Sequence, residues 1–168
     1  MDRPSRPWRW PTPPWWKKTP DMADEKIRLF HIETDADFDR AFPVIAQLRP
    51  QLTPQTFPER VRQQMKQGYR LAALEAGGQV RSLAGYRLLD YLWVGHAMYV
   101  DDLITDEASR SHRYGEQLMN WLREIADDDG CRELHLDSGL HRARAHRFYF
   151  RQGMYVDDFH FVLKLGPT

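Results

Sequence analysis

The sequence predicts a single mixed α/β domain in which helices cover both faces of one sheet. Three observations indicate this class. A chain of 168 residues is long enough for one domain with a substantial core. Segments with the two-residue period of strands and segments with the period of helices follow in the order β-α-α-β-β-β-α-β-α-β. Antiparallel strands come first and βαβ-like units later, which places helices on both sides of the sheet.

The first half of the domain is expected to hold a strand, two helices and a hairpin. Thr34 has the character of a helix cap and is followed by acidic residues in the first turn. Gly77-Gly78 separates two apolar segments, as in a tight turn between strands. The expected elements are a strand over 26–32, helices over 35–48 and 58–67, and strands over 69–76 and 79–91.

The second half is expected to alternate strands and helices. A strand over 97–105 leads into a polar loop and then into a helix with an apolar face from Tyr114 to Ile125. A strand over 133–138 and a basic helix over 142–152 follow. A last strand is predicted over 159–165, because Phe159, Phe161, Leu163 and Leu165 alternate with other residues.

Composition excludes several classes of protein. With 24 basic and 24 acidic residues the chain lacks the basic excess of a dedicated nucleic-acid binder. Its one cysteine, Cys131, excludes an internal disulfide and fits a reducing compartment, so we expect a cytoplasmic protein. No apolar run is long enough to predict a membrane span. No metal-ligand spacing occurs among the cysteine and histidine residues, so no metal is expected.

Residues 1–22 differ from the rest and are expected to form a disordered tail before a domain over 23–168. They carry six of the eleven prolines and four of the six tryptophans. Proline at this density prevents helices and sheet ladders. An upstream mis-start, a segment of cloning origin, and an arm that stacks on nucleic acid or a membrane surface are the alternatives.

The loop after the strand over 97–105 is the most informative stretch of the chain. It runs from Arg110 to Glu116 and opens directly onto a helix. Backbone N–H groups at such a helix start have no helical partner and lie at the positive end of the helix dipole, which suits a phosphate or pyrophosphate. The basic residues Arg110, His112 and Arg113 reinforce this field. An ordinary turn is the alternative.

Three segments in this order resemble the GNAT superfamily of acetyl-coenzyme A-dependent N-acetyltransferases, most closely a small-amine branch that includes aminoalkylphosphonate acetyltransferases. They are Arg110-Ser111-His112-Arg113-Tyr114-Gly115, Leu134-His135-Leu136-Asp137, and the helix that runs from Ala145 through Phe148-Tyr149 to Gly153-Met154. The resemblance covers residues 27–165. It implies a mostly antiparallel sheet of six or seven strands, and acetyl-CoA as the acetyl donor.

The resemblance also implies where coenzyme A is held. The Leu103-Ile104-Thr105 backbone would pair with the pantetheine arm like an added strand, and one of its N–H groups would face the thioester oxygen. Arg142 stands where many relatives carry a cofactor-contacting Asn. The pyrophosphate would lie on the loop, whose candidate residues are Arg110, Ser111, His112, Arg113, Tyr114, Gly115 and Glu116.

Arg113 replaces the middle glycine of the family's loop. If this position needs a positive φ, an arginine strains the loop or covers the phosphate site. If φ is ordinary, the guanidinium adds a phosphate contact. We expect the second case, because Gly115 is retained where the helix is tightest.

Tyr149 is the candidate general acid, because a phenol with a pKa near 10 can protonate a leaving thiolate. Core packing is its alternative role. The resemblance also implies that Asp102 is the favoured base and Asp137 its rival, with ion pairing to nearby arginines as the alternative for both. Asp101 and Asp102 are adjacent on a strand, so they are expected to point to opposite faces. Further candidates for the acceptor pocket or the base are His135, His141, His146 and His160.

These observations predict an N-acetyltransferase that moves an acetyl group directly to the primary amine of a small molecule. Three alternatives stay open: a protein N-terminal or lysine acetyltransferase, a non-catalytic acyl-CoA-binding module, and nucleic-acid binding through the tail, which the charge balance argues against. No membrane partner is expected, and a homodimer is compatible with the sequence.

Overall fold

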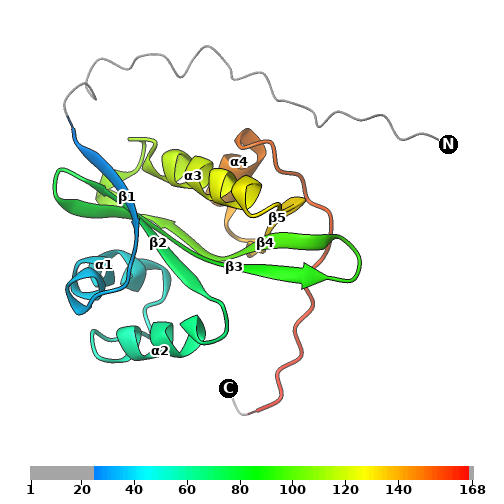
Figure 1. Cartoon of the computed structure of the whole chain (residues 1–168), viewed down its shortest axis with the longest axis horizontal. Helices are drawn as coiled ribbons and strands as arrows, with labels where there is room; N and C mark the ends of the chain where they lie inside the picture. Colours follow the sequence, from blue (N-terminus) through cyan, green and yellow to red (C-terminus); the bar gives the residue numbers. More distant parts are fainter. Residues whose placement is uncertain (1–24, 167–168) are drawn as a thin grey trace.

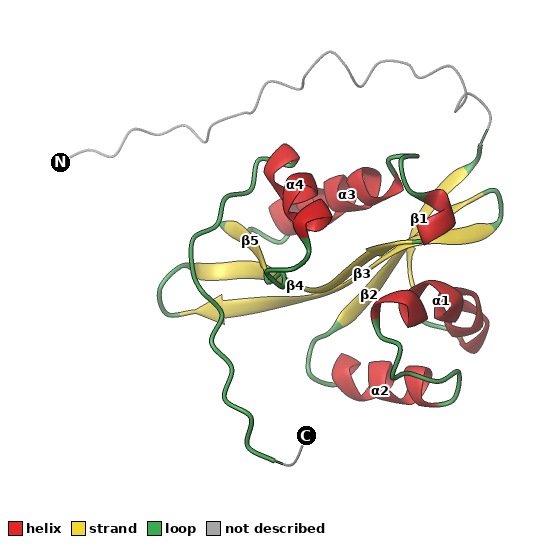
Figure 2. Cartoon of the chain, turned by 180° about the vertical axis from the view of Figure 1, so that it is seen from behind, coloured by secondary structure: helices red, strands yellow, loops and turns green. Residues whose placement is uncertain are grey.

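The computed structural model describes residues 25–166, which form one five-stranded sheet with helices on both faces (Figures 1 and 2). The tail predicted over residues 1–22 lies outside the described residues. The strands lie in the order β1-β2-β3-β4-β5, antiparallel from β1 to β4, with β5 parallel to β4. Their bounds are β1 Ile27–His31, β2 Arg70–Ala76, β3 Gln79–Tyr91, β4 Gly95–Thr105 and β5 Glu133–Leu136.

Two pairs of helices enclose the sheet. The helices α1 (Asp35–Leu48) and α2 (Thr56–Met65) lie on one face, and α3 (Tyr114–Asp128) and α4 (Ala143–Arg151) lie on the other (Figure 2). A short 3₁₀ turn, Glu107–Ser109, connects β4 to the loop before α3. The predicted mixed α/β class and the placement of helices on both faces are therefore confirmed.

Local sequence signals set several of these boundaries as predicted. At the start of α1, Thr34 Oγ1 accepts a hydrogen bond from the Asp37 N–H at 3.2 Å, and Asp37 Oδ2 accepts one from the Thr34 N–H at 3.1 Å. This reciprocal capping box satisfies amides that the first helical turn leaves unpaired. In the β2–β3 hairpin Gly77 and Gly78 have φ values of +58° and +75°, a turn conformation that residues with a Cβ rarely adopt.

Two apolar clusters, one on each face of the sheet, form the core. Between the sheet and α1–α2 lie Phe38, Ile45, Phe57, Leu71 and Leu83. Between the sheet and α3 lie Leu74, Tyr86, Met98, Leu118 and Leu122.

The prediction of a last strand over residues 159–165, and with it the expectation of six or seven strands, is wrong for the described residues. The chain after α4 is extended but pairs with no strand of residues 25–166. Alternation of apolar residues shows that a segment can bury one face, but a strand also needs a partner edge to form. The segment therefore keeps its apolar side chains in solvent. No helix within residues 25–166 has both the length and the apolar character required to cross a bilayer.

Candidate active site

The sheet has a notch, by which we mean the edge of β4 from Asp101 to Thr105 that is left unpaired where β5 ends. The two parallel strands pair from Ala97↔Glu133 to Val100↔Leu136, and β5 ends there. Beyond this point β4 continues to Thr105 and pairs only with β3 on its other side. One side of the last five residues of β4 is therefore left open by the described chain.

The main-chain groups of Leu103 and Thr105 face this open side. The Asp106 N–H donates to the Arg81 carbonyl at 2.8 Å, which fixes the phase of the antiparallel ladder between β3 and β4. In such a ladder hydrogen-bonded residues alternate with residues whose N–H and C=O groups point the other way. Ile104 and Asp102 consequently bond to β3, and the intervening residues present free donors and acceptors to the notch.

A β-bulge in β4 turns two carboxylates to the same face. Gly85 pairs with Asp102 and Tyr86 pairs with Val100, so Asp101 has no partner on β3. Asp101 Oδ2 accepts a hydrogen bond from Arg87 Nε at 3.0 Å, and Asp102 lies beside residues of the α1–α2 side. The expectation that the two aspartates point to opposite faces is wrong, because the extra residue of a bulge breaks the alternation of side chains.

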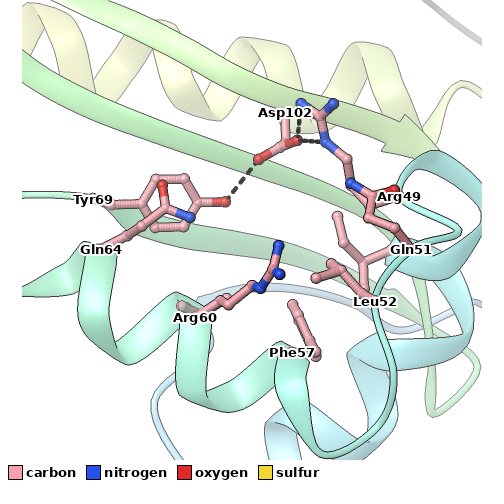
Figure 3. Close-up of a pocket in the computed structure, with 10 residues that line it drawn as sticks. Arg49, Gln51, Leu52, Phe57, Arg60, Gln64, Tyr69 and Asp102 are labelled. Carbon is pink, nitrogen blue, oxygen red and sulfur yellow. Dashed lines mark hydrogen bonds and ion pairs between the residues drawn. The ribbon is translucent and has the colours of Figure 1, made fainter. Parts of the chain in front are cut away.

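Asp102 is held by two donors from different parts of the chain (Figure 3). Arg49, at the end of α1, donates from Nε to Asp102 Oδ1 at 2.7 Å. Tyr69, just before β2, donates from its hydroxyl to Asp102 Oδ2 at 3.1 Å. Both carboxylate oxygens are therefore oriented, and the side chain is fixed toward the α1–α2 face.

Gly85 makes room for the Tyr69 hydroxyl. A Cβ at residue 85 would lie 1.8 Å from that oxygen, far inside van der Waals contact. The phenol is buried, and this burial, followed by the charge of Asp102, raises its pKa well above the ordinary value. Tyr69 therefore stays a hydrogen-bond donor at neutral pH. Neither Gly85 nor Tyr69 was identified from the sequence, although a lone glycine inside a strand is a known signal of close approach.

Burial also affects the second carboxylate of the bulge. It raises the pKa of Asp101, and the hydrogen bond from Arg87 opposes this effect. Arg87 reaches on to α2, where its Nη2 donates to Gln64 Oε1 at 2.6 Å. Asp101 is thus part of a bonded network that ties the bulge to α2.

A pocket of about 120 Å³ opens between α1, α2 and the bulge. Its wall carries Asp102 and Tyr69 at one end and two arginines, Arg49 and Arg60 (Figure 3). Arg49 is paired with Asp102, whereas Arg60 has no carboxylate oxygen of residues 25–166 within ion-pairing distance. The pocket therefore combines a carboxylate, a phenol and an unneutralised cation.

The loop from Arg110 to Glu116 leaves main-chain N–H groups unused at the start of α3. The first helical hydrogen bond of α3 runs from the Gln117 N–H to the Arg113 carbonyl oxygen at 3.0 Å. The N–H groups of the three preceding residues therefore donate no hydrogen bond within the helix. Gly115 fits closely here, because a Cβ would lie 2.8 Å from Thr105 Oγ1 and that side chain would have to shift. The small residue lets the N-terminus of α3 lie directly against the end of β4, beside the notch.

The expectation of an ordinary φ at Arg113 is wrong. Arg113 adopts φ +62° and ψ +15°, and Ser111 has φ +77°. The family's glycine is thus replaced at a position that keeps the left-handed backbone. Arg113 Nε lies 3.9 Å from Glu116 Oε2, so its side chain leans along the first turn of α3.

We expect Arg113→Gly to stabilise the protein. The left-handed conformation costs a residue with a Cβ roughly 1–2 kcal/mol, and the greater freedom of glycine in the unfolded chain offsets part of the gain. The free energy of unfolding in urea should rise by up to about 1 kcal/mol. Arg113→Ala, which removes the charge but keeps the strain, is the control and should show no gain. A glycine variant less stable than the alanine variant would contradict this explanation.

The other predicted loop residues make local contacts. Arg110 Nη1 pairs with Glu107 at 2.7 Å, and His112 Nδ1 lies 3.1 Å from the Ser109 carbonyl oxygen. The Tyr114 ring is buried and its hydroxyl donates to Glu25 at 2.6 Å. Tyr114 can therefore offer a ligand its main chain but not its hydroxyl.

Tyr149 lies on the opposite face of the sheet from Asp102. It lies in α4, the helix that follows β5, and its half-buried ring packs on the apolar cluster beneath α3. Its hydroxyl bonds to no described residue, and burial raises its pKa while nearby Arg142 opposes the rise. Arg142 itself is exposed at the start of α4. The structure thus places an unbonded phenol and an oriented carboxylate on either face of the notch, without contact between them.

Asp137 has different hydrogen-bond and ion-pair partners from Asp102. Its Oδ2 accepts from the Tyr99 hydroxyl and lies 2.8 Å from His160 Nδ1. Beside it, Ser138 has a buried Oγ with no hydrogen-bond partner among the described residues, a feature that the sequence gave no reason to expect. Both residues lie just past the end of β5, on the side of the notch opposite β4.

Of the remaining histidines that were considered as bases, His141 is exposed, whereas His135 and His146 lie in local structural contacts. His146 Nε2 lies 3.1 Å from the Gly139 carbonyl oxygen, and the His135 ring packs edge-on against Trp93. Neither contacts Asp102 or Tyr149.

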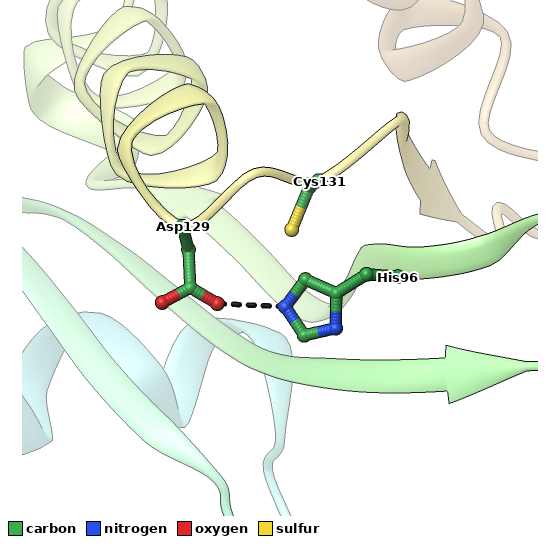
Figure 4. A group of neighbouring side chains, drawn as sticks. All are labelled: His96, Asp129 and Cys131. Carbon is green, nitrogen blue, oxygen red and sulfur yellow. Dashed lines mark hydrogen bonds and ion pairs between the residues drawn. The ribbon is translucent and has the colours of Figure 1, made fainter.

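His96, Asp129 and Cys131 form a separate cluster at the other end of β4 (Figure 4). His96 Nε2 lies 2.7 Å from Asp129 Oδ2, and its Nδ1 lies 2.8 Å from Asp90 Oδ1. These bonds, the one to Asp129 first, raise the pKa of His96. A raised pKa favours the protonated ring, whereas a metal ligand must be neutral. The ring lies between two carboxylates, Asp129 and Asp90, both of which favour its protonated form.

Comparison with known proteins agrees with this geometry. The family model described as the acetyltransferase (GNAT) family matches residues 3–154. The chain belongs to the GNAT family of acetyltransferases. An uncharacterized N-acetyltransferase, YhdJ of Bacillus subtilis (strain 168), is 28% identical over 137 residues, which cover 80% of this chain and 96% of that protein. The predicted family and enzyme class are thus confirmed.

Further relatives of this GNAT chain include an aminoalkylphosphonate N-acetyltransferase of Salmonella typhimurium. It is 30% identical over 99 residues, which cover 58% of this chain and 62% of that protein. Among solved structures, a transcriptional regulator from Bacillus halodurans C-125 has a TM-score of 0.74 at 19% identity, covering 83% of this chain and 100% of that one. AAC(6')-Iy in complex with a CoA-containing bisubstrate analog has a TM-score of 0.71 at 13% identity, covering 86% and 100%. These likenesses show a shared fold.

Proposed function

We propose that the protein transfers the acetyl group of acetyl-CoA directly to the primary amine of a small molecule that carries an acidic group. The observation that carries this proposal is the notch, where free main-chain groups of β4 lie next to the oriented carboxylate of Asp102. A thioester substrate that pairs with Leu103 and Thr105 would have its carbonyl near both. The family is one of acetyltransferases, which supports this choice of donor.

Each chemical requirement of the transfer has a candidate group. Asp102, directly or through a water, accepts the proton that the ammonium group must lose before its nitrogen attacks the thioester carbon. A main-chain N–H of β4 stabilises the negative charge that develops on the carbonyl oxygen. Tyr149 donates its hydroxyl proton to the sulfur as the carbon–sulfur bond breaks. The loop amides before Gln117 are suited to the pyrophosphate.

An acidic acceptor is favoured by the charge pattern of the pocket. Asp102 at one end suits an ammonium group, and the unneutralised Arg60 suits a phosphonate, phosphate or carboxylate. A volume of about 120 Å³ is small beside the roughly 300–1,000 Å³ of sites for larger ligands, which favours a small molecule over a peptide. The similarity to an aminoalkylphosphonate N-acetyltransferase supports the same class of acceptor.

The proposed reaction predicts thioester cleavage that depends on added amine and collapses in Tyr149→Phe. General acids usually contribute about 10²–10⁴-fold, so kcat should fall by at least about 100-fold. The thiol product can be followed with a thiol reagent over a panel of amino acids, aminophosphonates, neutral amines and a peptide. Because the pKa of Tyr149 is raised, the fall in wild-type kcat that accompanies deprotonation of this residue should occur only above about pH 10.

A loss of less than about threefold in Tyr149→Phe would remove this residue as the acid. Tight binding of coenzyme A without turnover of any amine would instead favour a non-catalytic module. Turnover of the peptide alone would favour a protein acetyltransferase.

Arg60→Gln should weaken the use of acidic acceptors selectively. A charge-assisted hydrogen bond contributes about 1.5–3 kcal/mol, so the KM of an acidic amine should rise roughly 10- to 100-fold while that of a neutral amine changes little. Arg62→Gln is the matched control, because Arg62 lies on the same helix but pairs with Asp35 and does not line the pocket. Equal effects of Arg60→Gln on both kinds of amine would contradict the assignment.

A further inference from the structure

Three side chains that can each ligate a metal lie together at the end of α3, away from the notch (Figure 4). His96 offers a ring nitrogen, Asp129 a carboxylate oxygen and Cys131 a sulfur, and these atoms all lie within 4.8 Å of one another. A tetrahedral zinc site with ordinary bond lengths places such atoms about 3.3–3.6 Å apart. Asp129 is the exposed member and can rotate to admit an ion, so small side-chain movements are enough to close the site.

The main chain holds the three ligands in position. Asp129 and Cys131 belong to the turn that ends α3, and Gly130 between them has φ +74°. This left-handed residue reverses the chain, so that both side chains face the ring of His96 (Figure 4). The carbonyl oxygen of His96 in turn accepts a hydrogen bond from the Arg132 N–H at 2.9 Å. The backbone is therefore already arranged as a binding site requires.

The second ring nitrogen of His96 has the partner that a metal-binding histidine usually has. Its Nδ1 lies 2.8 Å from Oδ1 of Asp90, at the end of β3. Histidine ligands commonly donate this second N–H to a carboxylate, which fixes the orientation of the ring and makes the ligating nitrogen more basic. An ion on Nε2 would leave the hydrogen on Nδ1, where Asp90 accepts it.

The charge around the cluster also favours a cation. Asp127 and Asp128 precede Asp129 at the C-terminal end of α3, and the last turn of this helix has no basic residue. The C-terminal end of a helix carries a partial negative charge, to which these carboxylates add. Burial, and then the charges of Asp129 and Asp90, raise the pKa of the Cys131 thiol, so the sulfur keeps its proton unless a cation lies beside it.

We propose that Nε2 of His96, a carboxylate oxygen of Asp129 and Sγ of Cys131 bind one zinc ion, with a water molecule as the fourth ligand. A thiolate and an imidazole select zinc over magnesium and calcium, which prefer oxygen ligands. The ion replaces the thiol proton and the proton on Nε2, because only the deprotonated groups are ligands. The protonated ring of His96 is thus the metal-free form of the same cluster.

The spacing of residues along the chain gave no sign of this site. His96 and Asp129 are 33 residues apart and come from different elements of the fold. The expectation that no metal binds rested on the absence of short-range ligand spacing. Such spacing does not reveal ligands that only the packing of α3 against β4 brings together.

Metal binding can be measured directly on the full-length protein. Tag-free protein treated with EDTA should take up one zinc ion per chain in competition with a chromogenic chelator. At a free zinc concentration about 100 times the Kd, its Tm should rise by about 5–10 °C. Cobalt(II) in place of zinc should give the near-ultraviolet absorption of a cobalt–thiolate bond and the strong visible bands of tetrahedral cobalt.

Variants assign the ligands. Asp90→Asn should weaken zinc binding about 10- to 100-fold, the usual cost of losing an outer partner of a ligand, and Cys131→Ser and His96→Gln should weaken it more. Cys131→Ser should also abolish the cobalt–thiolate absorption. His141→Gln is the matched control, because His141 is exposed and lies outside the cluster, and it should bind zinc as the wild type does.

Two results would overturn the proposal. One is a wild-type protein that takes up no zinc from the chelator and shows no thiolate absorption with cobalt. The other is zinc affinity that is unchanged in Cys131→Ser and His96→Gln but falls in His141→Gln, which would place the ion on exposed histidines. Because no step uses the notch or acetyl-CoA, the outcome is independent of the proposed acetyl transfer.

Discussion

Asp102→Asn should lower kcat by about 10²–10⁴-fold, the usual contribution of a positioned general base. The amide keeps the shape of the carboxylate and can still accept the hydrogen bond from Tyr69, but it has no capacity to take a proton from the acceptor ammonium group. The KM for acetyl-CoA should change little, because the free main-chain groups of β4 and the loop before α3 are untouched. Steady-state kinetics with the best amine of the panel provide the measurement.

Two parallel variants separate catalysis from structure. Asp101→Asn removes a neighbouring carboxylate of the same bulge and should lower kcat much less. Asp137→Asn tests the rival base on the other side of the notch. If Asp102→Asn costs less than about threefold while Asp137→Asn costs more than about 100-fold, the base is Asp137. If Asp102 serves only its ion pair with Arg49, the variant should lose stability but keep its kcat.

Gly85→Ala should damage both stability and activity. Its Cβ would lie 1.8 Å from the Tyr69 hydroxyl and 2.4 Å from the ring carbon that bears it, so the phenol must move. Tyr69 is only 4% exposed, and its neighbours leave a rigid ring little room to shift. Overpacking of this kind costs about 1–3 kcal/mol, and displacement of the phenol also releases Asp102 from one of its two donors.

Urea denaturation and kcat/KM should both report the Gly85→Ala defect, with a loss of activity of at least about tenfold in the folded enzyme. Gly139→Ala is the control for stability, since the nearest atoms there belong to the end of the His141 side chain and can move aside. In a Tyr69→Val background, the further cost of Gly85→Ala should nearly vanish. An undiminished cost in that background would mean that the glycine is needed for another reason.

Much of the fold could be predicted from the sequence, because the relevant signals are local. The capping residue Thr34 and the Gly77-Gly78 turn fix their elements through their own backbone and side-chain chemistry, and both are confirmed. The loop before α3 and the start of that helix are similarly encoded in a few consecutive residues. Its resemblance to the GNAT motif is confirmed at the level of the family.

The geometry around Asp102 could not be predicted in the same way. The β-bulge depends on how β3 and β4 align, and alternation along one strand alone gave the wrong orientation for Asp101 and Asp102. Arg49 and Tyr69 come from positions 53 and 33 residues away in the chain, so nothing near Asp102 in the sequence indicates them. The lone glycine at residue 85 was the one available sign of this contact.

The sequence by itself determined the order of the elements as far as α4, several helix and turn boundaries and the family, because each depends on residues that are neighbours along the chain. Only the tertiary structure decided that β4 continues unpaired on one side after Val100, that Asp102 is oriented from two distant segments, and that Arg113 is held at a positive φ. It also decided that the apolar segment at the C-terminal end finds no edge within residues 25–166. Strand pairing and burial depend on contacts between distant residues. An alternating pattern along the chain indicates that a segment needs a partner strand, but it does not identify that strand.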